Sequence, residues 1–154
     1  MGFERTDSYV FCMRRRKSTM IRTIRIDDLP QIKEIDEKSY GGSEIEVLKD
    51  FLKLNNAVGK VFEKEGQLQG YMLYALHEDH FYIASITVDP NCRMEGVGRR
   101  FVESLVKKFT SRRREIQLIC EETNDNLLFF KTLGFKSALV RNHYEKCDGI
   151  LWIF

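Results

Sequence analysis

The sequence has no apolar run long enough to cross a membrane and almost no excess of either charge. Lys and Arg number 25 against 23 Asp and Glu, which leaves a net charge of +2 at pH 7. Such a balance favours no specific nucleic-acid partner, and no membrane span is expected. A chain of 154 residues with 43% apolar and 31% charged residues has the size and composition of one globular domain.

Paired cysteines and clustered metal ligands are also missing. The four cysteines are widely spaced and include no Cys-x-x-Cys pair; they are Cys12, Cys92, Cys120 and Cys147. Cys120 lies in an apolar stretch and is expected to be a buried thiol. His77 and His80 have no third ligand nearby, so a solvent-facing hairpin end is favoured over a metal site. We therefore expect no bound metal and a reducing, cytoplasmic setting.

Basic residues are concentrated at the N-terminus. Residues 1–19 contain five basic residues against two acidic ones, a net charge of +3, and show no sustained periodicity. We predict a flexible basic extension over residues 1–19 and one domain over residues 20–154. Met1-Gly2-x-x-x-Thr6 matches an N-myristoylation pattern, and the run Arg14–Lys17 suits a membrane surface or a phosphate, but a solvated tail is the favoured interpretation.

What the sequence does contain is a strand, a loop and a helix between Phe81 and Phe109. The β-branched run Tyr82–Val88 predicts a strand, which stops where Asp89-Pro90 removes the next ladder donor. The loop that follows is Arg93-x-x-Gly96-x-Gly98. Apolar residues then recur at helical spacing, at Phe101, Val102, Leu105 and Phe109.

The loop has the features of a phosphate site. Backbone N–H groups at such a helix start converge on one spot, where the helix dipole adds positive potential. Arg99 and Arg100 in the first turn are explained if a polyanion lies opposite; otherwise the glycines form only a tight turn and the arginines are solvated. A Walker A loop is excluded because Gly-Lys-Ser/Thr is missing, and a dinucleotide fingerprint because Phe101 replaces its third glycine.

These motifs resemble the acyl-CoA loop of the GNAT acetyltransferase superfamily. In that family Arg/Gln-x-x-Gly-x-Gly/Ala follows a strand ending in Val-x-Pro, as Arg93–Gly98 follows Val88-Asp89-Pro90 here. A second family block, an Asn at a strand end and then Leu-Gly-Phe, matches Asn124 and Leu133–Phe135. The resemblance covers about residues 20–154. It implies an α/β (α+β) GNAT fold, with a mixed central sheet of about seven strands flanked by about four helices.

Periodicity and turn residues predict elements in the order that this fold requires. Asp27 or Asp28 is expected to cap a first helix with Pro30 in its first turn, and Ser43-x-x-Glu46 to form a capping box for a second. Arg112–Arg114 is expected at the C-terminal carbonyls of the helix that follows Gly98. A last helix is predicted over Asn126–Leu133. The predicted strands are Ile21–Ile26, Ala57–Lys64, Leu68–Leu76, Tyr82–Val88, Ile116–Glu121, Phe135–Tyr144 and Gly149–Phe154.

The resemblance implies acetyl-CoA as cosubstrate and indicates where it binds. The central strand's backbone pairs with the pantetheine arm, the loop amides take the pyrophosphate, and an Asn contacts the arm. The expected cofactor-binding residues are Ile86, Thr87, Val88, Arg93, Met94, Glu95, Gly96, Val97, Gly98, Arg99, Asn124 and Phe130.

The acceptor side is most similar to the ribosomal-protein and other protein N-terminal acetyltransferases, which have an Arg and a Tyr-Tyr pair where this chain has Arg141–Tyr144. Two family positions have lost their ionisable groups, at Ile119 and Phe130. Because alternate strand residues share a face, we expect Glu121 to replace the base lost at Ile119. Tyr82 and Tyr144 are expected to organise water or relay a proton; an ordinary strand residue explains each of the three as well.

The expected function is acetyl transfer to a primary amine by direct attack in a ternary complex, with a protein or peptide amino group as acceptor. A compact acidic pocket between Asp36–Gly42 and Arg141–Tyr144 would instead indicate a small amine. The losses at Ile119 and Phe130 would also suit an acyl-CoA-binding sensor. A monomer or a homodimer is expected.

Overall fold

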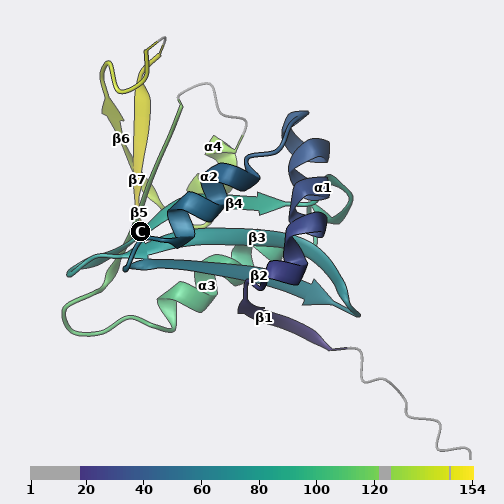
Figure 1. The fold of residues 1–154 in the computed structure, drawn as a ribbon. Helices are drawn as coiled ribbons and strands as arrows, with labels where there is room; N and C mark the ends of the chain where they lie inside the picture. The colour runs from purple at the N-terminus through teal and green to yellow at the C-terminus, as the bar shows by residue number, and fades with distance from the viewer. Residues whose placement is uncertain (1–17, 122–125, 146) are drawn as a thin grey trace, which may run out of the picture.

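The computed structural model describes residues 18–121, 126–145 and 147–154. In this part of the chain seven strands form one mixed sheet in the order β1-β2-β3-β4-β5-β7-β6, and four α-helices flank it (Figure 1). The fold class and the order of elements are therefore as predicted. The basic run Arg14–Lys17 and Asn124 lie outside the described residues. Among those described, no helix is long and apolar enough to span a membrane.

The elements have the following bounds. The strands are β1 Thr19–Thr23, β2 Ala57–Lys64, β3 Gln67–Leu76, β4 His80–Val88, β5 Glu115–Glu121, β6 Lys136–Val140 and β7 Gly149–Ile153. The helices are α1 Leu29–Tyr40, α2 Ile45–Leu52, α3 Val97–Val106 and α4 Leu127–Thr132. Strand β1 thus begins one residue before the domain boundary predicted at Met20.

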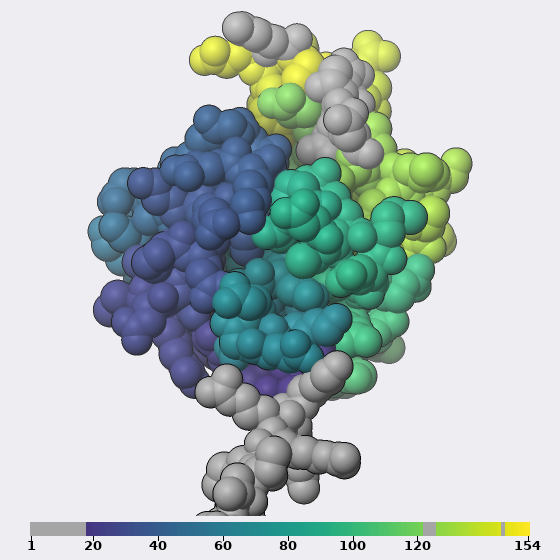
Figure 2. Space-filling model, turned by 90° about the vertical axis from the view of Figure 1, so that its right-hand side faces the viewer, coloured from purple at the N-terminus to yellow at the C-terminus, as the bar shows by residue number. Residues whose placement is uncertain are grey.

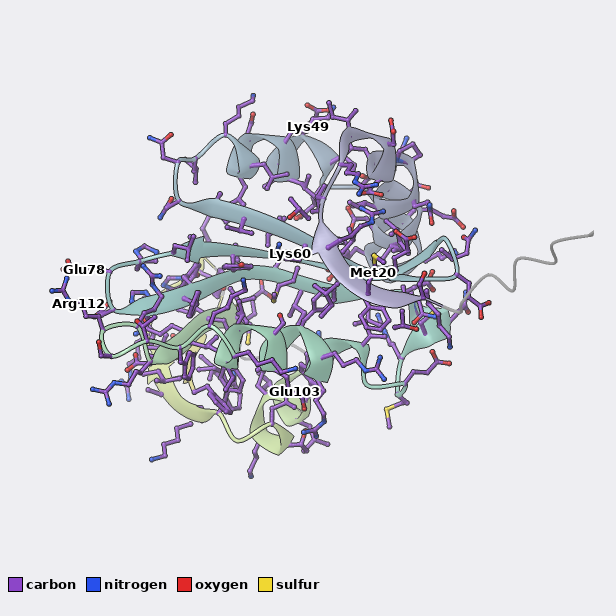
Figure 3. All side chains as sticks on the ribbon, turned by 90° about the horizontal axis from the view of Figure 1, so that it is seen from below. Met20, Lys49, Lys60, Glu78, Glu103 and Arg112 are labelled. Carbon is purple, nitrogen blue, oxygen red and sulfur yellow. The ribbon has the colours of Figure 1, made fainter. Side chains whose placement is uncertain are left out.

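Two apolar clusters lie on opposite faces of the sheet. One packs α3 and α4 against the sheet around Phe81, Phe101 and Trp152, and the other packs α1 and α2 around Ile32 and Val61. Figure 3 shows the two layers from below, with Lys49 of α2 and Glu103 of α3 on opposite sides. Each helix therefore buries one apolar stripe, as the helical spacing of these residues requires.

The predicted β2–β3 hairpin is confirmed, and its turn explains why the two strands pair. Glu65 and Gly66 both adopt left-handed backbone angles, with φ of 54° and 84°. Two consecutive residues with positive φ form the turn whose twist matches that of the flanking strands. Strand β3 also pairs with β4, and in that pair Tyr71 lies opposite Thr87.

Side-chain pairing overrides the predicted boundaries near α1. The first strand was expected to reach Ile26, but Ile26–Asp28 forms a 3₁₀ turn. The Asp28 carboxylate accepts bonds from the Arg25 N–H (2.7 Å) and from the Arg22 guanidinium (2.7 Å), which curls the chain before α1. The buried Asp28 carboxylate is paired with Arg22, which stabilises this turn, and the Arg22 guanidinium lowers the pKa of Asp28.

Three predicted helix-end interactions are wrong. Asp28 is at the N-cap position of α1, but its side chain makes no capping hydrogen bond to that helix. Ser43 Oγ accepts from the Ile45 N–H at 3.3 Å, while Glu46 pairs with Lys49, so no capping box forms. Helix α3 ends at Val106, well before the arginine run. Arg113 instead donates to the His77 carbonyl at 2.6 Å and stacks 5.3 Å from the centre of the Phe81 ring. The run therefore ties a loop to the β3–β4 hairpin rather than capping the helix.

The sheet splits between β4 and β5, its only parallel pair in the described chain. Pairing is limited to His80–Tyr82 against Glu115–Gln117, after which the strands separate, and Figure 1 shows β5, β7 and β6 rising away from β4. A register shift against β3 leaves Ala84 as an extra residue in β4, which bends the strand. The shift also reverses the faces, so that Ile86 packs toward α3 and Thr87 toward α1.

Candidate active site

A cavity of about 390 Å³ lies where β4 ends and α3 begins. In Figure 2 the end of α1, in blue, borders the green segment that holds the loop and the start of α3. Among the described residues, no acidic side chain lines the cavity. The lining residues are Tyr40, Ile86, Thr87, Val88, Cys92, Arg93, Met94, Gly96, Val97, Gly98, Arg99, Asn126, Phe129, Phe130 and Thr132.

The loop before α3 presents unused backbone donors. Asp89 is buried, accepts from the Asn91 N–H at 2.9 Å and lies 3.4 Å from Lys38, which fixes the start of the loop. Gly96 ends it in a left-handed conformation, with φ of 81°. In the described structure the N–H groups of residues 93–99 donate no hydrogen bond to the protein itself. These amides are therefore available to an anion at the positive end of the α3 dipole.

Close packing requires Gly98 for a different reason. A Cβ at this position would lie 2.7 Å from Cζ of Phe129, whose ring lines the cavity. Glycine therefore lets α4 pack directly against the first turn of α3. Helix α4 therefore contacts the start of α3 on this side of the cavity.

The two arginines of the first turn have separate roles. Arg99 lines the cavity, whereas Arg100 stacks over the Phe62 ring, with Cζ 5.6 Å from its centre. The expectation that both face a polyanion is thus wrong for Arg100. Arg93 supplies the second cation at the cavity wall.

The free edge of β4 continues the site away from the loop. Beyond Tyr82 the strand has no ladder with β5, so residues 83–88 keep backbone groups on that edge without a strand partner. An extended ligand can pair with such an edge as an added strand does. The apolar side chains Ile86, Val88 and Phe130 line the neighbouring wall. The edge and the amide loop together fit a long, phosphate-bearing cofactor.

Most of the predicted cofactor residues come together in this cavity. Glu95 does not line it, although its N–H is among the unused amides, and Asn124 lies outside the described residues. Sequence reasoning missed Tyr40, Cys92, Asn126, Phe129 and Thr132. Gly98 was the one available signal for Phe129. A glycine has no side chain, so it leaves room for another residue to pack closely against the backbone.

The predicted acceptor side lies on the sheet face opposite α3. Tyr144 lies in the connection that follows β6. In this connection Asn142 has a φ of 53°, and its N–H donates to the Asp148 carboxylate at 2.7 Å. The chain turns there, so the strand that was predicted to reach Tyr144 ends at Val140. Burial raises the pKa of Tyr144, and the charges of Tyr82 and Glu121 raise it further. Tyr82 and Glu121 are therefore near enough to Tyr144 to affect its pKa.

The alternation in β5 places Glu121 as expected. Ile116, Leu118 and Cys120 pack toward α3, so Ile119 and Glu121 share the other face. Glu121 is exposed at the strand end, and Ile119 is half-buried beside the Gly149 backbone. Burial raises the pKa of the half-buried Tyr82. Tyr82, in the last pair of β4 with β5, and Glu121, at the end of β5, thus lie on the two strands that border the split.

The two histidines of the motif stack on each other. The rings of His77 and His80 lie 4.5 Å apart and 4° from parallel, and Asp79 lies 2.7 Å from Nδ1 of His80. The described residues contain no group of three side chains placed to hold a metal ion. The edge of the His77 ring meets Tyr82, which links this pair to the split.

The chain belongs to the acetyltransferase (GNAT) family, whose family model matches residues 19–135. It is therefore an acetyl-CoA-dependent N-acetyltransferase, and acetyl-CoA is its cosubstrate. The unused amides, the free strand edge and the cavity fit this cosubstrate, which supplies the acetyl thioester. No curated protein sequence matches the chain significantly.

Solved structures with the same fold include enzymes with different acceptors. The ribosomal-protein-S18-alanine N-acetyltransferase from Escherichia coli has a TM-score of 0.74 and 19% identity, over 89% of this chain and 93% of that one. Arabidopsis thaliana NAA60 in complex with acetyl-CoA has a TM-score of 0.70 and 16% identity, over 89% and 98%. An aminoglycoside 6'-N-acetyltransferase complexed with coenzyme A has a TM-score of 0.73 and 13% identity, over 88% and 96%. Identities this low establish the fold alone.

Proposed function

We propose that this protein acetylates the amino group at the N-terminus of a protein or peptide. The main support is the border of the split, where the described residues of the cavity wall include no acidic side chain and Glu121 is exposed at the end of β5. A polycationic small amine needs an enclosed set of carboxylates, whereas a peptide needs an open approach to a single amine. The likeness to the ribosomal-protein-S18-alanine enzyme favours the same acceptor.

The cofactor-binding residues act mainly through the backbone. Amides of residues 93–99 bind the pyrophosphate, with Arg93 and Arg99 adding charge at the wall. The edge at Ile86–Val88 pairs with the pantetheine arm and brings the thioester to the split. Asn124 contacts the arm from the segment after β5. Together these contacts hold the carbonyl carbon within reach of the amine.

The catalytic roles fall to the three side chains at the split. Glu121 takes the proton, directly or through water, from the attacking amine, since Ile119 cannot. Tyr82 and Tyr144 orient that water and donate to developing negative charge, since a phenol is protonated at neutral pH and burial raises the pKa of both further. The thiolate can leave without a protein donor at Phe130, because a thiol of pKa about 8.5 is a tolerable leaving group. The free thiols of Cys92 and Cys120 agree with a cytoplasmic setting.

Mass spectrometry after incubation with acetyl-CoA tests the acceptor. A library of peptides with free N-termini is run beside peptides whose only amine is a lysine side chain and beside amino sugars and polyamines. Acetylation of N-terminal amines in preference to the others supports the proposal. Preferred acetylation of an amino sugar or polyamine contradicts it. Binding of acetyl-CoA without any product in single-turnover conditions contradicts it as well, and indicates a sensor.

A further inference from the structure

A second hollow, of about 320 Å³, lies along α3. One wall is a stripe of α3 residues spaced three and four apart, and the other consists of Leu133, which follows α4, and Phe154. Figure 3 shows Glu103, a member of this stripe, on the side of α3 that is turned away from the sheet. The residues of the stripe are Arg99, Val102, Glu103, Val106 and Lys107.

The hollow continues the cofactor cavity along α3. Arg99 lines both spaces, and at the end of α4 Thr132 lines the cavity while the next residue, Leu133, lines the hollow. From Arg99 to Val106 the helix rises about 10 Å, so the hollow begins at the first turn of α3 and follows the helix for about two turns. A cofactor whose diphosphate binds to the loop amides and whose arm follows β4 therefore has its adenosine end beside this hollow.

Phe154 presents a fixed aromatic surface to the hollow. Its backbone exchanges two hydrogen bonds with Ile116, of 2.9 and 3.2 Å, and its ring lies 5.1 Å from the Phe135 ring. The residue is nevertheless 38% exposed. An aromatic side chain that is already held in place loses little conformational entropy when a planar group stacks on it. The hollow is therefore suited to a flat, apolar ring such as a purine base.

The charged side chains of the stripe match the polar groups of a nucleotide. Among the described residues, the Arg99 and Lys107 side chains have no hydrogen-bonded or ionic partner. The Arg99 guanidinium, at the end of the hollow nearest the loop, is a donor for phosphate oxygens. The Glu103 carboxylate lies one turn further on and only accepts, so it suits the amino group of adenine and repels a phosphate. A phosphate near the loop and an amino-bearing base beyond it satisfy both.

We propose that this hollow binds the adenosine 3'-phosphate end of coenzyme A. The adenine ring stacks on Phe154, its amino group donates to Glu103, and the 3'-phosphate binds to Arg99. This subsite adds affinity through a part of the cofactor that takes no part in the transfer. It does not depend on which amine accepts the acetyl group.

The two halves of the cofactor test the proposal separately. Adenosine 3',5'-bisphosphate has the adenosine end without the arm, and phosphopantetheine has the arm without the adenosine. Phe154→Leu removes the stacking face and keeps an apolar side chain. The affinities for coenzyme A and for the bisphosphate should each fall about fivefold, the low end for one stacked base, while the affinity for phosphopantetheine stays unchanged. Isothermal titration calorimetry measures all three.

Two further variants separate this effect from a change in folding. Glu103 is exposed on α3, so Glu103→Ala leaves the core intact and should weaken the bisphosphate about threefold, as expected for one hydrogen bond. Phe109 stacks on Phe81 much as Phe154 stacks on Phe135, but it is not among the described residues that line either space. Phe109→Leu should therefore leave the three affinities unchanged. Thermal unfolding of every variant checks the fold.

Three outcomes would overturn the proposal. The first is an unchanged affinity for the bisphosphate in both Phe154→Leu and Glu103→Ala, and the second is an equal loss for the bisphosphate and phosphopantetheine. The third is a changed oligomeric state of Phe154→Leu in size-exclusion chromatography with no change in nucleotide affinity, which would assign the hollow to a contact between copies of this chain. No acceptor amine is present in these assays, so a failure of the peptide proposal leaves their result unaffected.

Discussion

The two sides of the split between β4 and β5 are built in different ways. The proposed cofactor side consists of backbone groups that are close in sequence: the edge of β4, the loop and the first turn of α3, all within residues 83–99. The proposed acceptor side consists of side chains that come from distant parts of the sequence, with Tyr82 on β4, Glu121 on β5 and Tyr144 after β6. One side depends on local chain geometry, and the other on tertiary packing.

This difference separates what each side can tolerate. Every residue except proline has a backbone N–H, whatever its side chain. The loop therefore depends on residue type only where a turn or a close neighbour requires glycine. A side-chain site changes its chemistry with each substitution, as Ile119 and Phe130 show. The fold can therefore keep one cosubstrate while its acceptors vary, as the peptide and aminoglycoside enzymes with this fold illustrate.

The largest effect is expected where the cofactor side is broken. Gly96→Glu places a side chain and a negative charge beside the unused amides, in a residue with φ of 81°. Acetyl-CoA affinity should fall by more than about 100-fold, or roughly 3 kcal/mol. Isothermal titration calorimetry with coenzyme A measures this loss.

Gly66→Glu is a matched control for that change. Gly66 has a φ of 84°, and, as at Gly96, an added Cβ would meet nothing within 4 Å. The two variants therefore share the same backbone strain and the same added charge, but Gly66 lies in the β2–β3 turn, outside the cavity. Equal affinities for coenzyme A in the two variants would show that the loop does not bind the cofactor phosphates.

The second effect tests the acceptor side. If Glu121 is the base, Glu121→Gln should lower kcat about 100-fold, at the low end of general-base effects, and leave acetyl-CoA affinity unchanged. The pH dependence of kcat should change with it. Glu115→Gln is the control, because Glu115 begins the same strand at the other end. Full activity with an unshifted pH profile would remove Glu121 as the base.

The third effect joins the two sides through α4. Gly98→Ala should push the Phe129 ring away, since the new Cβ would lie 2.7 Å from it, and destabilise the protein by about 1–3 kcal/mol. Acetyl-CoA affinity should fall about tenfold. Adding Phe129→Leu makes room for the methyl group and should restore much of both losses. If the second substitution restores neither, the contact with Phe129 is not the reason for glycine at this position.

The same contrast explains what could be predicted from the sequence. The fold, the β2–β3 hairpin and most of the cofactor cavity were accessible because their signals are local: turn residues, strand runs and glycine spacing. The roles of Arg100 and Arg113 were not, because each stacks on an aromatic ring from another strand. Nor was the contact between Tyr40 and Thr87, since two hydroxyls 47 positions apart leave no pattern in the sequence.

The smallest effect concerns the phenol at the rim of the acceptor side. Burial and the charges of Tyr82 and Glu121 raise the pKa of Tyr144, so its protonated form persists above the usual range near 10. If catalysis needs the Tyr144 proton, kcat/KM should rise with pH as the acceptor amine is deprotonated. It should not fall before about pH 10, where the phenol would begin to ionise. Tyr144→Phe should lower kcat/KM about threefold across that range without changing the shape of the profile. A fall in the wild-type rate well below pH 10 that disappears in Tyr144→Phe would show that the phenol ionises early, and would contradict the packing inferred around it.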